Sequence, residues 1–337
     1  PEWRGALYNG GMSTTTTATR PSGSELFTQR AGETLRHLED AGQLKHLQMI
    51  DSPMDATVTL RDHGEVVCFC SNNYLGLANH PEVVEAGIAG LKQYGAGTAS
   101  VRFICGTFTP HESVERTIAE FLGVEQAYTF VSCWNATEAI FPTLCEPGDI
   151  IVSDELNHAC IIDSMRLATQ IKKGVHKTVY KHSDMDDLRS KLRAATDDPD
   201  VTGVIWVVTD GVFSMEGDIA KLPELRELCN EFGALLCVDD SHGTGVMGPT
   251  GRGTHEYFGM AGADIDFFTG TLGKALGGAA GGYIAGSHVG TEMIVQRARP
   301  TLFSNALPVT VACSAQKAIE ILMREPQRVE LLRDNVA

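Results

Sequence analysis

A single lysine, Lys274, lies in the stretch TGTLGKALGGAAGG (residues 269–282), among small residues and six glycines, with no acidic neighbour. The stretch resembles half of a phosphate-binding P-loop, but that motif needs Ser or Thr after the lysine, and residue 275 is Ala. A lysine in a dry pocket of small residues has its pKa lowered and becomes a nucleophile towards aldehydes. The sequence therefore predicts that Lys274 forms an imine with a carbonyl compound.

A carboxylate and a histidine follow a different apolar run. In LLCVDDSHGTG, Asp239 comes directly after four apolar residues, and His242 lies three residues further on. A buried carboxylate needs a partner, so Asp239 either caps the next turn or stays ionised against a protonated heterocyclic nitrogen. Residues 243–248 also match G-x-G-x-x-G, but that fingerprint must open a helix, and proline and glycines follow at 249–253. We therefore interpret this glycine match as accidental.

Other residues are of the types that hold a phosphate and an aromatic ring. Ser132-Cys133-Trp134 opens a predicted helix, whose free N–H groups and dipole favour a phosphate, and Thr271 adds a hydroxyl. His158 and Trp134 are flat rings that could cover a pyridine or pack in the core. An aldehyde-reactive lysine, a carboxylate and a phosphate-binding helix start together predict a pyridoxal phosphate (PLP) site.

Alternating strands and helices must position these residues. Short β-branched runs are found at 127–131, 149–152, 177–180, 203–208, 234–238, 265–269 and 282–285. Helical patterns lie at 111–122, 134–145, 158–168, 185–195 and 222–232. This alternation predicts an α/β fold with a mostly parallel central sheet and helices on both faces, and such sheets bind ligands at the carboxyl ends of their strands. Because the candidate residues follow five of these strands, we expect them to converge on one site.

The flanking regions complete the predicted domain organisation. A helix is expected over 25–50, β segments at 56–60 and 66–70, a helix beginning near Pro81 and another around 308–324. We predict a disordered tail or non-native extension over 1–24 and an N-terminal helix with a short β segment over 25–70. The large cofactor-binding domain would be 71–300, and 301–337 would be a linker and the start of an incomplete small C-terminal domain.

Composition excludes several classes of protein. The 337 residues suggest about two domains at roughly 150 residues per domain. The net charge of −16, from 27 basic and 43 acidic residues, argues against nucleic acid or an anionic membrane as the main partner. Nine cysteines without a C-x-x-C pair predict reduced thiols and no metal site. With no long apolar run and no signal peptide, we expect a cytoplasmic protein.

Several long motifs occur in order and carry a family resemblance. They are SNNYLGL, GTASVRFICGT, SDELNHACIIDSMR, TDGVFSMEGDIAKL, VDDSHGTGVMGPTGRGTHEY, TGTLGKALGGAAGGYIAG and RPTLFSNALP. From about residue 25 to the last residue, the chain resembles the α-oxoamine synthases, PLP-dependent fold-type I transferases that join an amino acid to an acyl-CoA. Within that family, ASVRFICGT, TDGVFSM and RPTLFSN most resemble the members that act on glycine and acetyl-CoA.

The resemblance implies a role for each matching cofactor residue. Lys274 would carry the cofactor as an imine, Asp239 would pair with its pyridinium nitrogen, and His242 would bind its phenolic oxygen and polarise the reacting carbonyl. The other implied cofactor contacts are His158 on the ring, Ser214 beside it, and Cys133, Trp134 and Thr271 at the phosphate. Ser304 and Asn305 would reach the phosphate of the other subunit's cofactor, which implies a homodimer.

Fewer residues are implied on the substrate side. Asn72 would meet the substrate carboxylate, with Asn73 as the alternative, and His158 would lie beside the substrate. Arg102 is a candidate contact for the acyl chain or CoA, or alternatively part of a surface salt bridge. The family continues beyond the position of Ala337 into a small domain whose arginine binds that carboxylate. We therefore expect this sequence to be part of a longer protein, and a chain ending here to bind glycine poorly.

The implied reaction is the condensation of glycine with acetyl-CoA to 2-amino-3-oxobutyrate and CoA, or the reverse cleavage in threonine breakdown. The nearest alternative is a sibling synthase of the 5-aminolaevulinate, 8-amino-7-oxononanoate or sphingoid-base type. HGTG at 242–245 is shared with the haem and biotin siblings, and Ala136-Thr137 stands where relatives often have Ala-Asn. An aminotransferase of the same fold and a catalytically silent binding subunit are the remaining alternatives.

Overall fold

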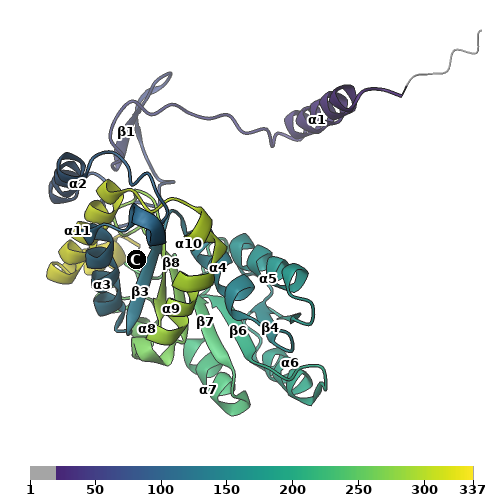
Figure 1. The fold of residues 1–337 in the computed structure, drawn as a ribbon. Coiled ribbons are helices and arrows are strands. Elements are labelled where there is room, and N and C mark those ends of the chain that lie inside the picture. The colour runs from purple at the N-terminus through teal and green to yellow at the C-terminus, as the bar shows by residue number, and fades with distance from the viewer. Residues whose placement is uncertain (1–19, 337) are drawn as a thin grey trace, which may run out of the picture. The chain divides into compact units, whose positions relative to one another are not determined.

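The computed structural model describes residues 20–336, which divide into a unit ending at Met49 and a unit beginning at Ile50 (Figure 1). The predicted tail therefore lies mostly outside the described residues. Helix α1 (Gly23–Asp40) begins with a capping box, in which Ser22 and Glu25 exchange hydrogen bonds between side chain and backbone. The predicted helix over 25–50 is too long, because the chain turns at Gly42 with a left-handed φ of 65°. The predicted domain boundaries at residues 70 and 300 stay predictions.

The second unit begins with a small antiparallel hairpin. Strands β1 (Thr57–Leu60) and β2 (Gly64–Val67) pair with Thr57 opposite Val67. The predicted β segment is present, but its second strand begins and ends earlier than expected. Helix α2 (Pro81–Tyr94) starts at the predicted proline, whose missing N–H costs nothing in the first helical turn.

A seven-stranded sheet forms the centre of this unit, in the order β3-β9-β8-β7-β6-β4-β5. The strands are β3 (Gln126–Phe130), β4 (Ile150–Asp154), β5 (His176–Tyr180), β6 (Ile205–Asp210), β7 (Leu235–Asp239), β8 (Phe267–Thr271) and β9 (Gly282–Gly286). Strands β4 to β8 are parallel, and β9 is antiparallel to both of its neighbours, so β3 runs in the same direction as β4 to β8. The predicted mostly parallel sheet is confirmed, and every strand except β9 has its carboxyl end at the same edge.

Helices cover both faces of the sheet. They are α3 (Thr109–Leu122), α4 (Cys133–Leu144), α5 (Ala159–Ile171), α6 (Met185–Asp197), α7 (Leu222–Phe232), α9 (His288–Arg297), α10 (Arg299–Phe303), α11 (Val309–Arg324) and α12 (Gln327–Val336). Three short elements complete the unit: η1 (Arg102–Gly106), α8 (Thr254–Tyr257) and η2 (Gly262–Asp264).

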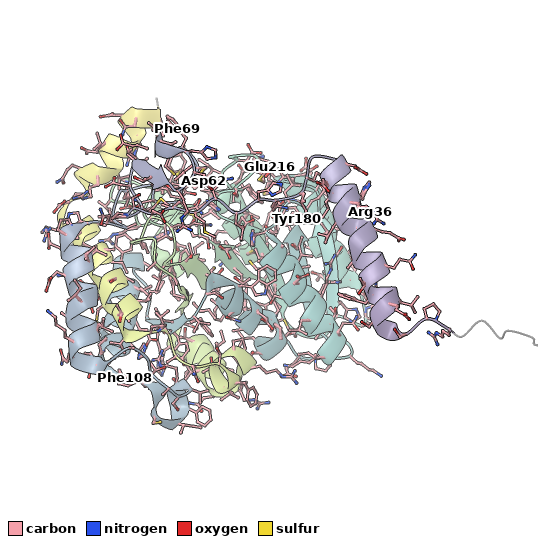
Figure 2. The ribbon with its side chains drawn as sticks, turned by 90° about the horizontal axis from the view of Figure 1, so that it is seen from above. Arg36, Asp62, Phe69, Phe108, Tyr180 and Glu216 are labelled. Atoms are coloured by element: carbon pink, nitrogen blue, oxygen red, sulfur yellow. The ribbon has the colours of Figure 1, made fainter. Side chains whose placement is uncertain are left out.

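Successive strand residues point to opposite faces, and this divides the core in two. In β7, Leu236 and Val238 belong to one cluster of buried residues, and Cys237 belongs to the other. Tyr180 lies in the interior in Figure 2, whereas Phe69, in the loop after β2, is 94% exposed. Two buried faces explain why the strands read as continuous apolar runs.

Neither a membrane span nor a metal cluster is found in the described part of the chain. No helix within residues 20–336 is long and apolar enough to cross a membrane. Those residues also contain no group of three or more His, Cys, Asp or Glu side chains placed to hold a metal ion.

Candidate active site

Loops at the carboxyl edge of the sheet surround one cavity of about 470 Å³, which we call the lysine cavity. The loops follow β3, β4, β6, β7 and β8, as the strand order requires. Eight of the predicted site residues line this cavity: Cys133, Trp134, His158, Ser214, Asp239, His242, Thr271 and Lys274. The convergence expected from the sequence is therefore present.

Lys274 lies in the turn that follows β8, and its side chain is half-buried. Its Nζ atom is 2.7 Å from Nε2 of His242. Burial lowers the pKa of Lys274, and the nearby Asp239 carboxylate opposes that shift. The amine thus loses its proton more readily than an exposed lysine, as a nucleophile towards an aldehyde must.

His242 connects the lysine to a residue that the sequence did not single out. Burial, followed by the charge of Lys274, lowers the pKa of His242 to about 4, so its ring is neutral at pH 7. Its Nδ1 atom is 3.1 Å from the hydroxyl of Tyr74, which donates a hydrogen bond to Oδ1 of Asn72 at 3.0 Å. Asn73 instead accepts a hydrogen bond from the backbone of Ala78. Asn72, not Asn73, is therefore connected to His242 through Tyr74. Tyr74 lies in the motif SNNYLGL, directly after the two asparagines, but its residue type alone did not mark it as part of the site.

Asp239 ends β7 and is buried, with hydrogen-bond donors around both carboxylate oxygens. Oδ2 accepts a hydrogen bond from the hydroxyl of Thr269 at 2.8 Å, and the hydroxyl of Thr137 shares its proton between Oδ2 at 3.2 Å and the backbone carbonyl of Cys133 at 3.1 Å. Oδ1 accepts a hydrogen bond from the backbone N–H of Ser241 at 3.1 Å. The predicted capping role is confirmed, and the alternative, a pairing with a heterocyclic nitrogen, stays a prediction for a carboxylate that lines the lysine cavity. Thr137, noted only as a departure from the family pattern, proves to be one of its donors.

The start of α4 forms another wall of the lysine cavity. Ser132 caps this helix by accepting a hydrogen bond from the N–H of Asn135, and Cys133 and Trp134 begin it. A Cβ atom at Gly282 would lie 2.3 Å from Cα of Cys133, so only glycine lets β9 pack this closely against the helix start. Free N–H groups at such a start attract a phosphate.

Two aromatic rings lie at the mouth of the lysine cavity. The rings of Trp134 and His158 are 6.3 Å apart and nearly perpendicular, at 77°. Trp134 is 43% exposed, which contradicts the alternative that it packs in the core. His158 caps α5 through Nδ1, and its backbone N–H donates to Asp210, a second buried acid that lines the cavity.

The residues expected to serve a partner subunit lie elsewhere. Ser304 and Asn305 follow α10 and do not line the lysine cavity. Asn305 is exposed and pairs with Val101 in an isolated β-bridge. Their predicted role towards a second copy of the chain stays a prediction.

Arg102 does not lie on the surface, which corrects the expectation of an exposed side chain. Its side chain is 8% exposed and makes a two-pronged ion pair with Glu115, with distances of 2.7 and 3.1 Å. It also donates to the hydroxyls of Thr107 and Thr129, and its guanidinium lies 4.5 Å from the centre of the Tyr128 ring. With these donors engaged, its position supports a structural role and gives no support to contact with the acyl chain or CoA.

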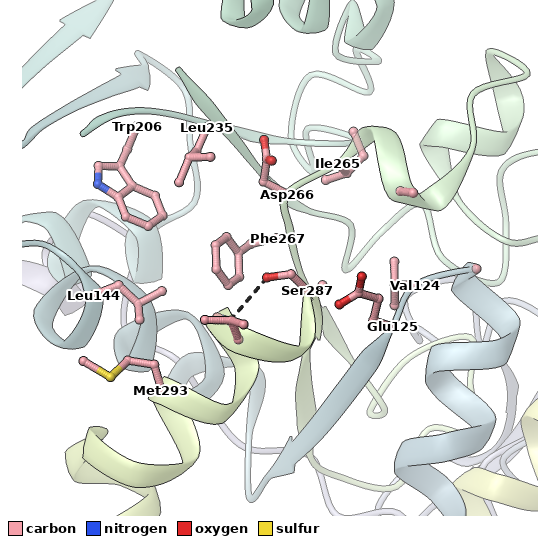
Figure 3. Close-up of a pocket in the computed structure, with 15 residues that line it drawn as sticks. Val124, Glu125, Leu144, Trp206, Leu235, Ile265, Asp266, Phe267, Ser287 and Met293 are labelled. Atoms are coloured by element: carbon pink, nitrogen blue, oxygen red, sulfur yellow. Dashed lines mark hydrogen bonds between the residues drawn. The ribbon is translucent and has the colours of Figure 1, made fainter. Parts of the chain in front are cut away.

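A second cavity, of about 550 Å³, lies beside the amino ends of β7 and β8 (Figure 3). Its walls are mainly apolar, and Figure 3 labels Leu144, Trp206, Leu235, Phe267 and Met293 among them. The two carboxylates there are already engaged, Asp266 with Arg226 at 2.7 Å and Glu125 with the N–H of His288. No lysine, arginine or histidine is among its lining residues, so size alone does not mark the reactive site.

Comparison with known proteins agrees with this chemistry. The family model described as aminotransferase class I and II matches residues 64–337. The mitochondrial 2-amino-3-ketobutyrate coenzyme A ligase of Homo sapiens is 45% identical over 290 residues, which are 86% of this chain and 67% of that protein. The 8-amino-7-oxononanoate synthase of Alkaliphilus metalliredigens is 42% identical over 303 residues, 90% of this chain and 74% of that protein.

A solved structure shows the same fold. A lysine variant of serine palmitoyltransferase from S. paucimobilis, with a bound PLP–myriocin aldimine, superposes with a TM-score of 0.83 at 29% identity. The match covers 94% of this chain and 76% of that one. The predicted fold type I and the resemblance to the α-oxoamine synthases are thereby confirmed. The chain belongs to the aminotransferase class I and II family.

Proposed function

We propose that this chain is a PLP-dependent acyltransferase that condenses glycine with acetyl-CoA to 2-amino-3-oxobutyrate and CoA, or catalyses the reverse cleavage. This is the activity of a glycine C-acetyltransferase, also called 2-amino-3-ketobutyrate CoA ligase. One observation carries the proposal: the Lys274 amine, whose pKa is lowered, shares a cavity with the buried carboxylate of Asp239 and the start of α4. The relatives that bear this ligase name, 45% identical in Homo sapiens and 43% in Escherichia coli, support the choice of substrates.

The residues around the lysine cavity fit PLP. Asp239, held by three hydrogen bonds, can stabilise a positive charge on the pyridine nitrogen. The N–H groups at the start of α4, with Thr271 nearby, suit the phosphate, and Lys274 suits the aldehyde. When bound, PLP acts as an electron sink that makes the Cα proton of an attached amino acid acidic.

The chain's own side chains then bind the substrate and move the proton. Lys274 can take the Cα proton because its amine has a lowered pKa and lies inside the cavity. His242 is neutral at pH 7, so it can hydrogen-bond the reacting groups without adding a positive charge beside the amine of Lys274. Asn72 is proposed to bind the substrate carboxylate. His158 and Trp134, which line the lysine cavity, are proposed to lie beside the bound substrate and cofactor. Ser304 and Asn305 are proposed to complete the site of a second copy in a homodimer.

Sibling synthases form the second candidate function, since the Alkaliphilus relative is 42% identical. The test is to load the chain with PLP and to follow loss of the acyl-CoA thioester with glycine, alanine or serine and a series of acyl-CoAs. We expect glycine and acetyl-CoA to be preferred. A clear preference for another amino acid or a longer acyl group would overturn the substrate assignment but leave the reaction class intact.

A lysine variant tests the reaction class itself. Lys274→Ala should abolish the visible absorbance of bound PLP and lower the rate of thioester loss by at least about 10²–10⁴-fold, as expected for removal of a general base. Lys177→Ala, at an exposed position in β5, is the matched control and should behave like the parent chain. If Lys274→Ala keeps both the absorbance and the rate, the proposed function is wrong.

The cellular compartment of this activity is a separate proposal. The sequence predicts the cytoplasm, and the human relative, which is named as mitochondrial, supplies the alternative.

A further inference from the structure

Four side chains form a continuous chain of hydrogen bonds that ends at the reactive amine. Asn72 Oδ1 and Tyr74 Oη are 3.0 Å apart, Tyr74 Oη and His242 Nδ1 are 3.1 Å apart, and His242 Nε2 and Lys274 Nζ are 2.7 Å apart. The members come from the loop before α2, the turn after β7 and the turn after β8. Tyr74 and His242 are 168 positions apart in the sequence, so only the fold brings them together.

The phenol proton of Tyr74 decides which atoms donate and which accept along this series of hydrogen bonds. A tyrosine hydroxyl has one proton to donate, and Tyr74 donates it to Oδ1 of Asn72. Towards Nδ1 of His242 the same oxygen can therefore only accept a hydrogen bond. Burial raises the pKa of Tyr74, so its hydroxyl keeps this proton at neutral pH.

This order of donors and acceptors fixes which nitrogen of His242 carries the ring proton. A neutral imidazole has one N–H and one lone pair, and an accepting oxygen opposite Nδ1 places the N–H there. The lone pair then lies on Nε2 and faces Nζ of Lys274, whose N–H donates to it. In the described part of the chain, the ring nitrogens of His242 have no other hydrogen-bond partner.

We propose that Tyr74 is a positioning residue that holds His242 in the tautomer with its proton on Nδ1, so that Nε2 presents a lone pair to the Lys274 amine. Its importance for catalysis rests on the proposed function, whereas the tautomer is a property of the chain alone. A substrate carboxylate bound by the amide N–H groups of Asn72 leaves Oδ1 free to accept from Tyr74. Substrate binding therefore leaves the donors and acceptors of this hydrogen-bond series unchanged, and Tyr74 couples the carboxylate site to His242.

The tautomer can be measured directly by NMR on the protein with ¹⁵N-labelled histidine, before PLP is added. Two-bond ¹H–¹⁵N correlations distinguish a protonated from an unprotonated ring nitrogen, and the signal missing from His242→Gln is that of His242. We expect a protonated Nδ1 and an unprotonated Nε2 in the chain before PLP is added. A protonated Nε2 in the parent chain before PLP is added would overturn the proposal, whatever the variants do.

Three substitutions then test what makes His242 prefer the tautomer with its proton on Nδ1. Tyr74→Phe keeps the ring and removes the accepting oxygen, so the Nδ1–H form should no longer dominate. Asn72→Ala frees the Tyr74 proton to donate to Nδ1, which should move the ring proton to Nε2. Asn72→Asp keeps oxygen acceptors only, so it should retain the parent tautomer. An unchanged tautomer in Tyr74→Phe would overturn the role of Tyr74.

Kinetics distinguish positioning from packing in the PLP-loaded chain. Tyr74→Phe should lower kcat by about three- to tenfold, the range for one lost neutral hydrogen bond, with little change in KM for glycine. Tyr94→Phe removes a hydroxyl whose one hydrogen-bond partner among the described residues is Gln93, and it should change neither the tautomer nor kcat. An altered tautomer with unchanged kcat would overturn the catalytic part of the proposal. If the expected tautomer is found but no condensation occurs, the proposed function alone has failed.

Discussion

Replacing Arg102 with methionine tests whether this arginine stabilises the fold or contacts a ligand. The buried guanidinium donates to both oxygens of Glu115, and Glu115 is itself only 12% exposed. Methionine has a similar length but no charge or donor. The substitution therefore leaves a buried carboxylate whose remaining partners are the N–H and hydroxyl of Thr129.

Breaking a buried ion pair by removing one partner costs about 3–5 kcal/mol, because the other charge stays buried without compensation. We expect the lower end of this range, since the two hydrogen bonds from Thr129 remain. For a unit of this size, about 2 °C of melting temperature is lost per kcal/mol, so Arg102→Met should melt about 6 °C lower.

The assay is thermal unfolding, with urea unfolding as a second measure. Arg61→Met is the matched control, because Arg61 makes a similar two-pronged pair with Asp51, with side chains 59% and 46% exposed. Exposed pairs contribute at most about 1 kcal/mol, so this control should melt within about 2 °C of the parent chain. If Arg102→Met melts like the control and instead raises KM for the acyl-CoA, the structural reasoning is refuted and the ligand role returns.

Two further predictions concern other hydrogen-bonded acids. Thr269→Val removes the 2.8 Å donor to Asp239 and should weaken PLP binding by about three- to tenfold in an absorbance titration; unchanged affinity would contradict a role for this donor. Burial opposes protonation of His182, but its hydrogen bonds to Asp154 and Asp218 outweigh burial and raise its pKa. The stabilisation of the fold by protonated His182 is fully present below the ordinary His pKa of about 6.5. It is lost as the pH rises through the higher pKa that His182 has in the folded protein. Asp218→Asn should therefore lower the melting temperature near pH 6 more than near pH 9, and an equal loss at both would refute the linkage.

Residues whose role depends on their local sequence were the ones that could be predicted. Lys274 was identified from its small neighbours, and Asp239 from the apolar strand before it. The alternation of strands and helices likewise predicted the parallel sheet, because strands buried on both faces must be continuously apolar. Patterns of this kind are set by covalent neighbours and by the period of each element, both of which a sequence contains.

Residues that act through distant partners were missed or misplaced. Thr137 donates to a carboxylate 102 positions away, and Tyr74 reaches a histidine 168 positions away. A hydroxyl has many possible partners, so its residue type alone gives no direction. Arg102 was expected either to contact the acyl chain or CoA or to form a surface salt bridge; it does form a salt bridge, but a buried one, because its partner Glu115 is recognised only in the fold.

Two carboxylates meet at the carboxyl edge of the sheet, and their surroundings separate their roles. Asp210 ends β6 directly opposite Asp239 at the end of β7, and both line the lysine cavity. Burial, followed by the charge of Asp239, raises the pKa of Asp210 well above its ordinary range, and its carboxylate accepts one hydrogen bond, from the backbone N–H of His158. Asp239 has the two threonine hydroxyls and the N–H of Ser241 to stabilise its negative charge. Asp239 is thus the acid of the pair whose surroundings favour a carboxylate, which supports its proposed role opposite a cationic ring nitrogen.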